Sequence, residues 1–172
     1  ADEPLIENLR RCIWVVDLNR QSLDRVIPGI RIQRFQQMFE ANGWKVVVAK
    51  YGAALTELME SPGGEALRRR IDDMSNEEYQ AMLRVPRDEV RERLLSGAGS
   101  LRRDIERCTA DLDDHELAGR IANLGGHDVE TLADCYAEAL RSESPAVVFA
   151  YTIKGWGLPM AGDPRNHAAL LN

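Results

Sequence analysis

Three short apolar runs place the strongest limits on how this chain can fold. They are residues 12–18, 44–50 and 146–153, and each is rich in β-branched or aromatic side chains. Runs of this kind are typical of strands in a parallel sheet that is covered on both faces. The sequence therefore predicts an α/β fold, with a three-layer parallel sheet and flanking helices.

Helical periodicity joins the first two runs. Between Pro28 and Gly43, apolar residues recur at the spacing of a helix: Ile30, Ile32, Phe35, Met38 and Phe39. Gly43 suits the helix end, because glycine accepts the positive φ found there. Strand, helix and strand within about 40 residues form a βαβ unit with an expected right-handed crossover.

Residues 53–124 follow a different pattern, that of helices with charged faces. Turn-forming residues break this stretch at 61–64, near Pro86 and at 96–100. The basic run Arg68–Arg70 could bind phosphate, but acidic residues lie beside it. A solvated helix face with salt bridges is the favoured interpretation.

Two later segments carry the marks of a helix start. The acidic stretch 111–116 complements a helix dipole, and its His115 is interpreted as a surface residue. Gly125 and Gly126 permit a tight turn, and Asp128 can cap the next helix. His127, which lies between Gly126 and Asp128, is either structural or part of a site, with the structural role favoured. The predicted buried stripe of that helix is Leu132, Cys135, Tyr136, Ala139 and Leu140.

Composition limits the class of protein. A chain of 172 residues with 44% hydrophobic residues suffices for one core, so one domain is expected. A net charge of -6 argues against nucleic acid or an anionic membrane as the main partner. Three scattered cysteines form neither a disulfide framework nor a zinc site, and no apolar run approaches the roughly 18 residues of a membrane span. A cytoplasmic protein is expected.

Polar residues follow two of the predicted strands. Asn19 and Gln21 come after the first, at the edge of a parallel sheet where ligands bind. Their oxygens could ligate a hard cation or contact a phosphate, although a plain turn is favoured on spacing alone. Lys154, beside Gly155, suits an anionic cofactor or substrate. His167 lies in a loop rich in glycine and proline, where it is either simply exposed or able to carry a proton.

Five segments in order resemble a known enzyme family. They are VVDLNRQSLD, GWKVVVAKYG, PGGEALRRRIDDM, NLGGHD and AYTIKGWGLPMAGDPRNHAALL. Together they are similar to the thiamine diphosphate-dependent decarboxylating component of bacterial pyruvate dehydrogenase, of the large homodimeric type related to transketolase. The resemblance implies that residues 1–172 are part of the domain that binds the cofactor diphosphate, with a helical insertion at about 53–124.

The resemblance also assigns roles to individual residues. Asn19 matches the family's asparagine ligand to Mg2+, and Gln21 matches the next ligand, which coordinates through its backbone carbonyl. Leu23 matches a loop position beside thiamine diphosphate. Lys154 matches the lysine of the family's TIKG motif near the cofactor. His167 aligns with the histidine of a mobile active-site loop that assists acyl transfer, and it is the expected catalytic residue.

The implied reaction is the oxidative decarboxylation of pyruvate or a related 2-oxoacid. The acyl group would pass to the lipoyl arm of an acyltransferase component, and the parent enzyme would be a homodimeric oxidoreductase. A transketolase-like transferase is the alternative enzyme class.

One departure from the family pattern qualifies these roles. The family's Gly-Asp-Gly motif, whose aspartate is the first magnesium ligand, does not precede Asn19 in this sequence. A fragment or a shortened relative is therefore expected, with weak cofactor binding and no useful catalysis by itself. A noncatalytic α/β domain, retained as an interaction module, is the second hypothesis.

Overall fold

The chain divides into two units in the computed structural model, which describes residues 12–19, 21–22, 25–26 and 29–163. The first unit combines Ala1–Gly52 with Leu124–Thr152. The second combines Ala53–Asn123 with Ile153–Asn172. Each unit draws on two segments that are distant in sequence.

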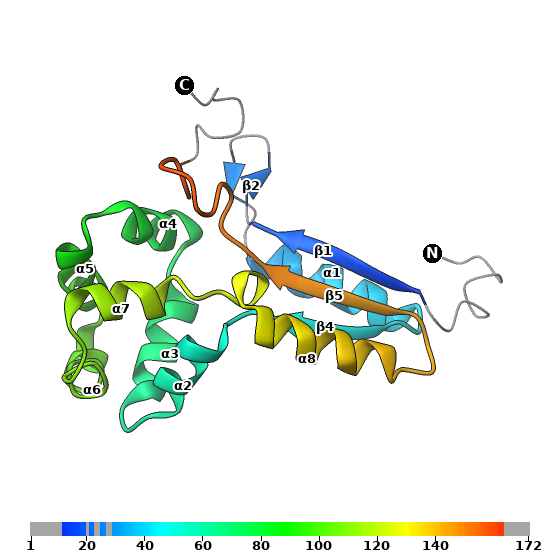
Figure 1. The fold of residues 1–172 in the computed structure, drawn as a ribbon, viewed down its shortest axis with the longest axis horizontal. Helices are drawn as coiled ribbons and strands as arrows, with labels where there is room; N and C mark the ends of the chain where they lie inside the picture. The colour runs from blue at the N-terminus through cyan, green and yellow to red at the C-terminus, as the bar shows by residue number, and fades with distance from the viewer. Residues whose placement is uncertain (1–11, 20, 23–24, 27–28, 164–172) are drawn as a thin grey trace. The chain divides into compact units, whose positions relative to one another are not determined.

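A parallel sheet of three strands forms the centre of the first unit (Figure 1). The strands are β1 (Ile13–Leu18), β4 (Lys45–Ala49) and β5 (Ala146–Tyr151), in the spatial order β1-β5-β4. Ala146 is the register partner of both Ile13 and Lys45. All three predicted strands are present, and the predicted parallel α/β fold is confirmed.

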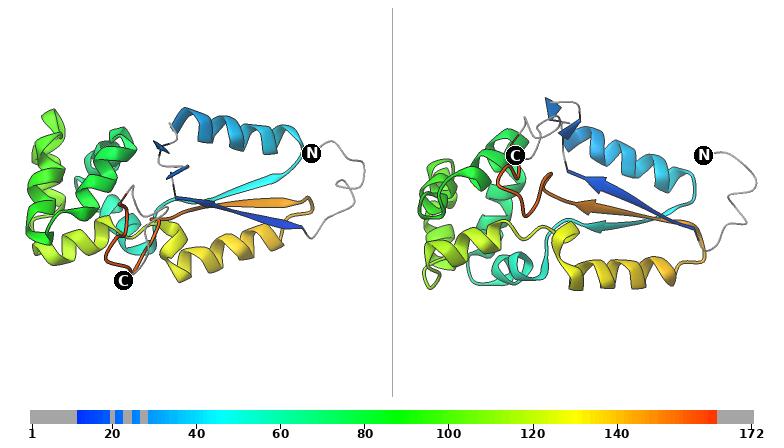
Figure 2. Two further views of the ribbon diagram at one scale, coloured as in Figure 1. Left: turned by 90° about the horizontal axis from the view of Figure 1, so that it is seen from above. Right: turned by 45° about the horizontal axis from the view of Figure 1, so that its top comes forward.

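One helix covers each face of this sheet, which gives the three predicted layers (Figure 2). Helix α1 (Gly29–Ala41) contributes Phe39 to a cluster with Trp44, Val147 and Phe149. Helix α8 (Val129–Leu140) contributes Cys135 and Ala139 to the cluster on the other face, with Val47, Ala49, Ala146 and Val148. Alternate residues of β5 enter opposite clusters, because successive side chains of a strand point to opposite faces.

The predicted burial of β1 on both faces is wrong. β1 lies at an edge of the sheet, and Trp14 and Val15 are 54% and 43% exposed. All six residues of the central strand β5 are buried, by contrast. An edge strand has a neighbour on one side only, so its side chains lack the cover that β5 receives from two flanking strands and two helices.

The predicted stripe of α8 is wrong at Leu140, which is 71% exposed. Leu140 follows Cys135 by five residues, which places it about 140° around the helix from that buried side chain. Leu132 and Tyr136 are partly buried and pack against the cluster, as the periodicity indicates.

The pKa of the Cys135 thiol is raised by burial and by nearby Glu138 and Asp134. The thiol is therefore neutral where it packs.

Helices dominate the segment Ala53–Asn123 of the second unit, which we call the helical unit. They are α2 (Ala53–Glu60), α3 (Gly64–Asp73), α4 (Asn76–Arg84), η2 (Arg87–Glu89), α5 (Val90–Ser96), η3 (Gly99–Leu101), α6 (Arg102–Cys108) and α7 (Asp114–Ile121). The predicted breaks at 61–64, near Pro86 and at 96–100 are confirmed. The acidic helix start is confirmed too, since Asp113 caps α7 in a reciprocal capping box with Glu116.

The prediction of a solvated helix face for Arg68–Arg70 is wrong at Arg70. Arg70 is only 5% exposed, and its Nε donates to the Leu94 carbonyl over 3.1 Å. Its guanidinium also pairs with the Glu78 carboxylate. A Cβ at Gly97 would overlap this guanidinium. Arg70 therefore joins α3, α4 and α5 through polar contacts in the interior of the helical unit.

We expect Arg70→Ala to destabilise the chain by about 2–3 kcal/mol, because it removes two hydrogen bonds from a buried site. Urea unfolding followed by circular dichroism measures the change. Arg69→Ala is the matched control, since Arg69 is the exposed neighbour on the same helix. Its expected effect is within about 0.5 kcal/mol. Equal effects of the two substitutions would contradict the role assigned to Arg70.

Candidate functional site

The carboxyl ends of β1 and β5 bring two polar residues to one edge of the sheet. Leu18 and Tyr151 are register partners at the ends of these strands. The Thr152 amide donates to the Leu18 carbonyl over 3.3 Å, which extends the pairing by one step. Asn19 and Thr152, the residues that follow the two strands, are therefore neighbours at the edge where parallel sheets bind ligands.

Asp17 links these two residues. The Thr152 hydroxyl donates to its Oδ1, and the Asn19 side-chain amide Nδ2 donates to its Oδ2 over 3.3 Å. Both carboxylate oxygens thus accept a hydrogen bond. One comes from Asn19, just after β1, and the other from Thr152, just after β5. We call Asp17, Asn19 and Thr152 the polar cluster of the first unit.

A short ladder follows the polar cluster. Strand β2 (Gln21–Ser22) pairs in antiparallel fashion with β3 (Arg25–Val26). Gln21 therefore has extended backbone two residues beyond Asn19. This ladder was not predicted, because two-residue strands are too short to show a periodic pattern.

Two glycines bring η4 (Gly125–His127) against the same edge of the sheet. The Gly125 amide donates to the Lys50 carbonyl over 3.1 Å, just after β4. A Cβ at Gly125 would lie 2.5 Å from the Ala49 carbonyl carbon, and a Cβ at Gly126 would lie 2.5 Å from the Tyr151 backbone carbonyl oxygen. The glycines are thus required for close approach to the ends of β4 and β5.

The helix that follows η4 begins as predicted. The Thr131 amide donates to the Asp128 carboxylate over 2.8 Å, so Asp128 is the N-cap of α8. His127 is half-buried, and its amide donates to the Leu124 carbonyl over 2.9 Å. Gly125–Asp128 therefore connects the sheet edge to the covering helix.

Three further site residues were predicted: Lys154, Leu23 and His167. Lys154 belongs to the second unit, where its carbonyl accepts from the Gly162 amide over 2.9 Å. The chain from Lys154 to Gly162 is therefore a closed loop, built of successive turns. Leu23 and His167 lie outside the described residues.

The polar cluster offers oxygen atoms as possible metal ligands. Asp17 has a carboxylate and Asn19 a side-chain amide, and the backbone carbonyl of Gln21 follows two residues later. Oxygen ligands of this kind suit Mg2+, which prefers a few protein ligands together with phosphate oxygens and water. Among the described residues no three His, Cys, Asp or Glu side chains gather as a metal site. The polar cluster differs from such a site because it holds one carboxylate.

Asp17 and Thr152 are the residues that the sequence analysis missed. Asp17 was counted as part of an apolar strand, although it stands two residues before Asn19. Thr152 became relevant only through the register of β1 with β5. A side-chain hydrogen bond between residues 135 positions apart carries no local signal in the sequence.

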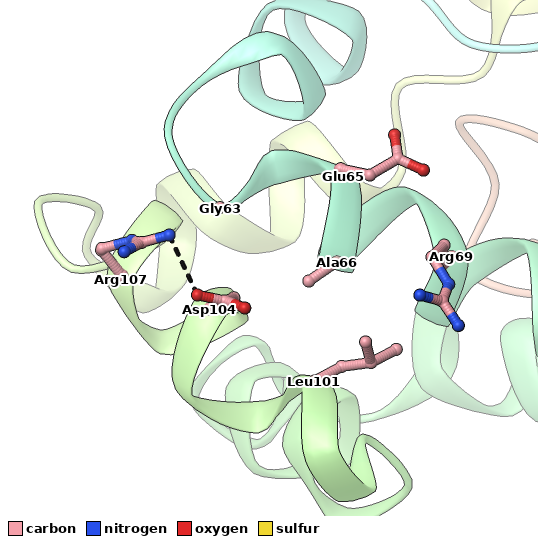
Figure 3. Close-up of a pocket in the computed structure, with 7 residues that line it drawn as sticks. All are labelled: Gly63, Glu65, Ala66, Arg69, Leu101, Asp104 and Arg107. Carbon is pink, nitrogen blue, oxygen red and sulfur yellow. Dashed lines mark ion pairs between the residues drawn. The ribbon is translucent and has the colours of Figure 1, made fainter.

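The helical unit holds a separate pocket of about 300 Å³ (Figure 3). It lies between α3 and the segment η3–α6, and an ion pair of 2.9 Å joins Arg107 to Asp104 at one side of it. Its lining residues are Gly63, Glu65, Ala66, Arg69, Leu101, Asp104 and Arg107. Two acidic and two basic side chains share its wall, so the pocket does not select one sign of charge. Lys154, the predicted site residue that is described in this unit, is not among them.

Comparison with known proteins gives a consistent set of relatives. The pyruvate dehydrogenase E1 component of Corynebacterium glutamicum is 31% identical over 166 residues, which cover 94% of this chain and 17% of the relative. The E1 components of Cupriavidus necator and Escherichia coli are 28% and 26% identical over 165 residues, 94% of this chain and 18% of each relative. A comparison with protein-family models finds no match.

The chain is a homologue of one segment of the pyruvate dehydrogenase E1 component. The resemblance drawn from the five sequence motifs is thereby confirmed. The chain spans about a sixth of the length of these relatives. Within the described residues, no helix has the length and apolar character to cross a membrane.

We expect Gly126→Ala to destabilise the chain by about 1–3 kcal/mol, because the added methyl group would displace η4 from the end of β5. Urea unfolding measures the effect. Gly119→Ala is the control, since a Cβ there meets no atom within 4 Å inside α7. It should stabilise the chain by about 0.5–1 kcal/mol. Stabilisation by both substitutions would show that η4 does not need the close approach.

Proposed function

We propose that this chain is the part of a 2-oxoacid dehydrogenase decarboxylating component that binds the magnesium and diphosphate of thiamine diphosphate. The observation that carries the proposal is the similarity to pyruvate dehydrogenase E1 components over 94% of the chain. The polar cluster at the carboxyl edge of the sheet supports it, because that edge is the usual ligand site of parallel α/β folds. The proposed substrate is pyruvate or a related 2-oxoacid.

We propose that Asn19 and Gln21 are ligands of the magnesium ion. Asn19 would coordinate through its side-chain oxygen and Gln21 through its backbone carbonyl, and both choices agree with the oxygen preference of Mg2+. Leu23 would lie beside the cofactor. Lys154 would add positive charge near it, which suits a diphosphate.

Bound thiamine diphosphate supplies the nucleophile and the electron sink for decarboxylation. The residues of this chain would bind and orient it, while His167 would transfer a proton when the acyl group passes to a lipoyl-bearing acyltransferase. The proposal includes a homodimeric enzyme in the cytoplasm. Transketolase-like chemistry is less well supported, since the relatives reported above are all E1 components.

We expect the complete enzyme to bind thiamine diphosphate with Mg2+ in isothermal titration calorimetry. Asn19→Ala should weaken that binding by at least about tenfold, because it removes a metal ligand. Gln37→Ala is the matched control, since it removes an exposed amide from α1. Its binding should equal that of the wild type.

Two outcomes would count against the proposal. Absence of cofactor binding by the complete wild-type protein would favour the noncatalytic interaction module. Unchanged binding by Asn19→Ala would remove the metal role from the end of β1.

We expect His167→Ala in the complete enzyme to slow acyl transfer to lipoyl groups by roughly 10²-fold and to slow decarboxylation less, because the loss concerns one proton transfer. Reductive acylation of a lipoyl domain measures the first step, and carbon dioxide release from pyruvate measures the second. His115→Ala is the control, since its exposed ring contacts Arg87 in the helical unit. Equal losses in both steps would contradict the proposed role of His167.

A further inference from the structure

We infer that Asp17 is a positioning residue for the metal site: it holds the Asn19 amide so that the oxygen, and not the nitrogen, is available as the ligand. This inference rests on the proposed function. It concerns a residue to which the sequence motifs assign no role.

The direction of the hydrogen bond follows from the chemistry of its partners. An ionised carboxylate only accepts hydrogen bonds, so the amide end of Asn19 that faces Asp17 must be the NH2 group. The Asn19 Nδ2 lies 3.3 Å from Asp17 Oδ2. Because the amide group is planar, a fixed Nδ2 also fixes the direction of Oδ1. A hard cation requires that oxygen, whereas the NH2 group has no lone pair to give.

Thr152 holds the carboxylate in turn. Its hydroxyl donates to Asp17 Oδ1, so the two carboxylate oxygens have separate partners. Thr152 is fixed by the backbone bond from its amide to the Leu18 carbonyl. Its Cγ2 is also the atom that a Cβ at Gly126 would meet at 2.5 Å. The orientation of Asn19 therefore depends on the pairing of β1 with β5 and on the position of η4.

Two substitutions at Asp17 separate the effect of its hydrogen bonds from the effect of its charge. Asp17→Ala removes both acceptors, and with them the hydrogen bond that orients the Asn19 amide. Asp17→Asn removes the charge but keeps the geometry, because its oxygen can accept from Asn19 while its NH2 donates to the Thr152 hydroxyl oxygen. Asp17 is exposed, so neither substitution disturbs a core.

The test titrates Mn2+ into the complete enzyme with thiamine diphosphate present and follows free Mn2+ by electron paramagnetic resonance. We expect Asp17→Ala to weaken Mn2+ binding by about tenfold or more, as loss of a residue that orients a metal ligand does. Asp17→Asn should bind like the wild type. Thr152→Val should bind more weakly than the wild type, and Thr152→Ser should restore binding.

Three results would overturn the inference. If Asn19→Ala loses Mn2+ but Asp17→Ala does not, the metal site stands and Asp17 has no part in it. If Asp17→Asn binds as weakly as Asp17→Ala, Asp17 acts through its charge and not through orientation. If the wild type itself fails to bind Mn2+, the proposed function fails and the inference falls with it.

Discussion

The pairing of β5 with strands on both sides is the constraint on which the first unit depends. Every residue of β5 is buried, and its backbone hydrogen bonds go to β1 on one side and β4 on the other. β1 and β4 come from the first 50 residues, whereas β5 begins at Ala146. Because backbone groups in an apolar interior must be paired, the correct register of these distant segments is a condition for folding.

The same register assembles the candidate site. Asp17, Asn19 and Thr152 meet because β1 and β5 are parallel and end at the same level. Residues Gly125–Asp128 then bring a short helical turn against the strand ends and start α8, which covers one face of the sheet. Packing and polar chemistry are therefore coupled at this edge. A displacement of η4 would alter both the core under α8 and the residue that orients Asp17.

Much of the fold could be predicted because its signals are local. The strand runs, the helix breaks, Gly43 as a helix end and the Asp128 cap each depend on a few neighbouring residues, and all are present in the structure. The errors concern residues whose surroundings come from elsewhere. Arg70 is buried because α4 and α5 pack over it, and Trp14 is exposed because β1 has one strand neighbour.

The sequence by itself determined the α/β class, the three strands of the sheet and the similarity to E1 components, because periodicity and motif order are properties of the linear chain. It also marked Asn19 and Gln21 as the residues that leave the first strand. The tertiary structure alone decided that Thr152 and Asp17, far apart in the sequence, share a hydrogen bond. The physical reason is that strand order and register bring these groups together, and neither is written in any single stretch of sequence.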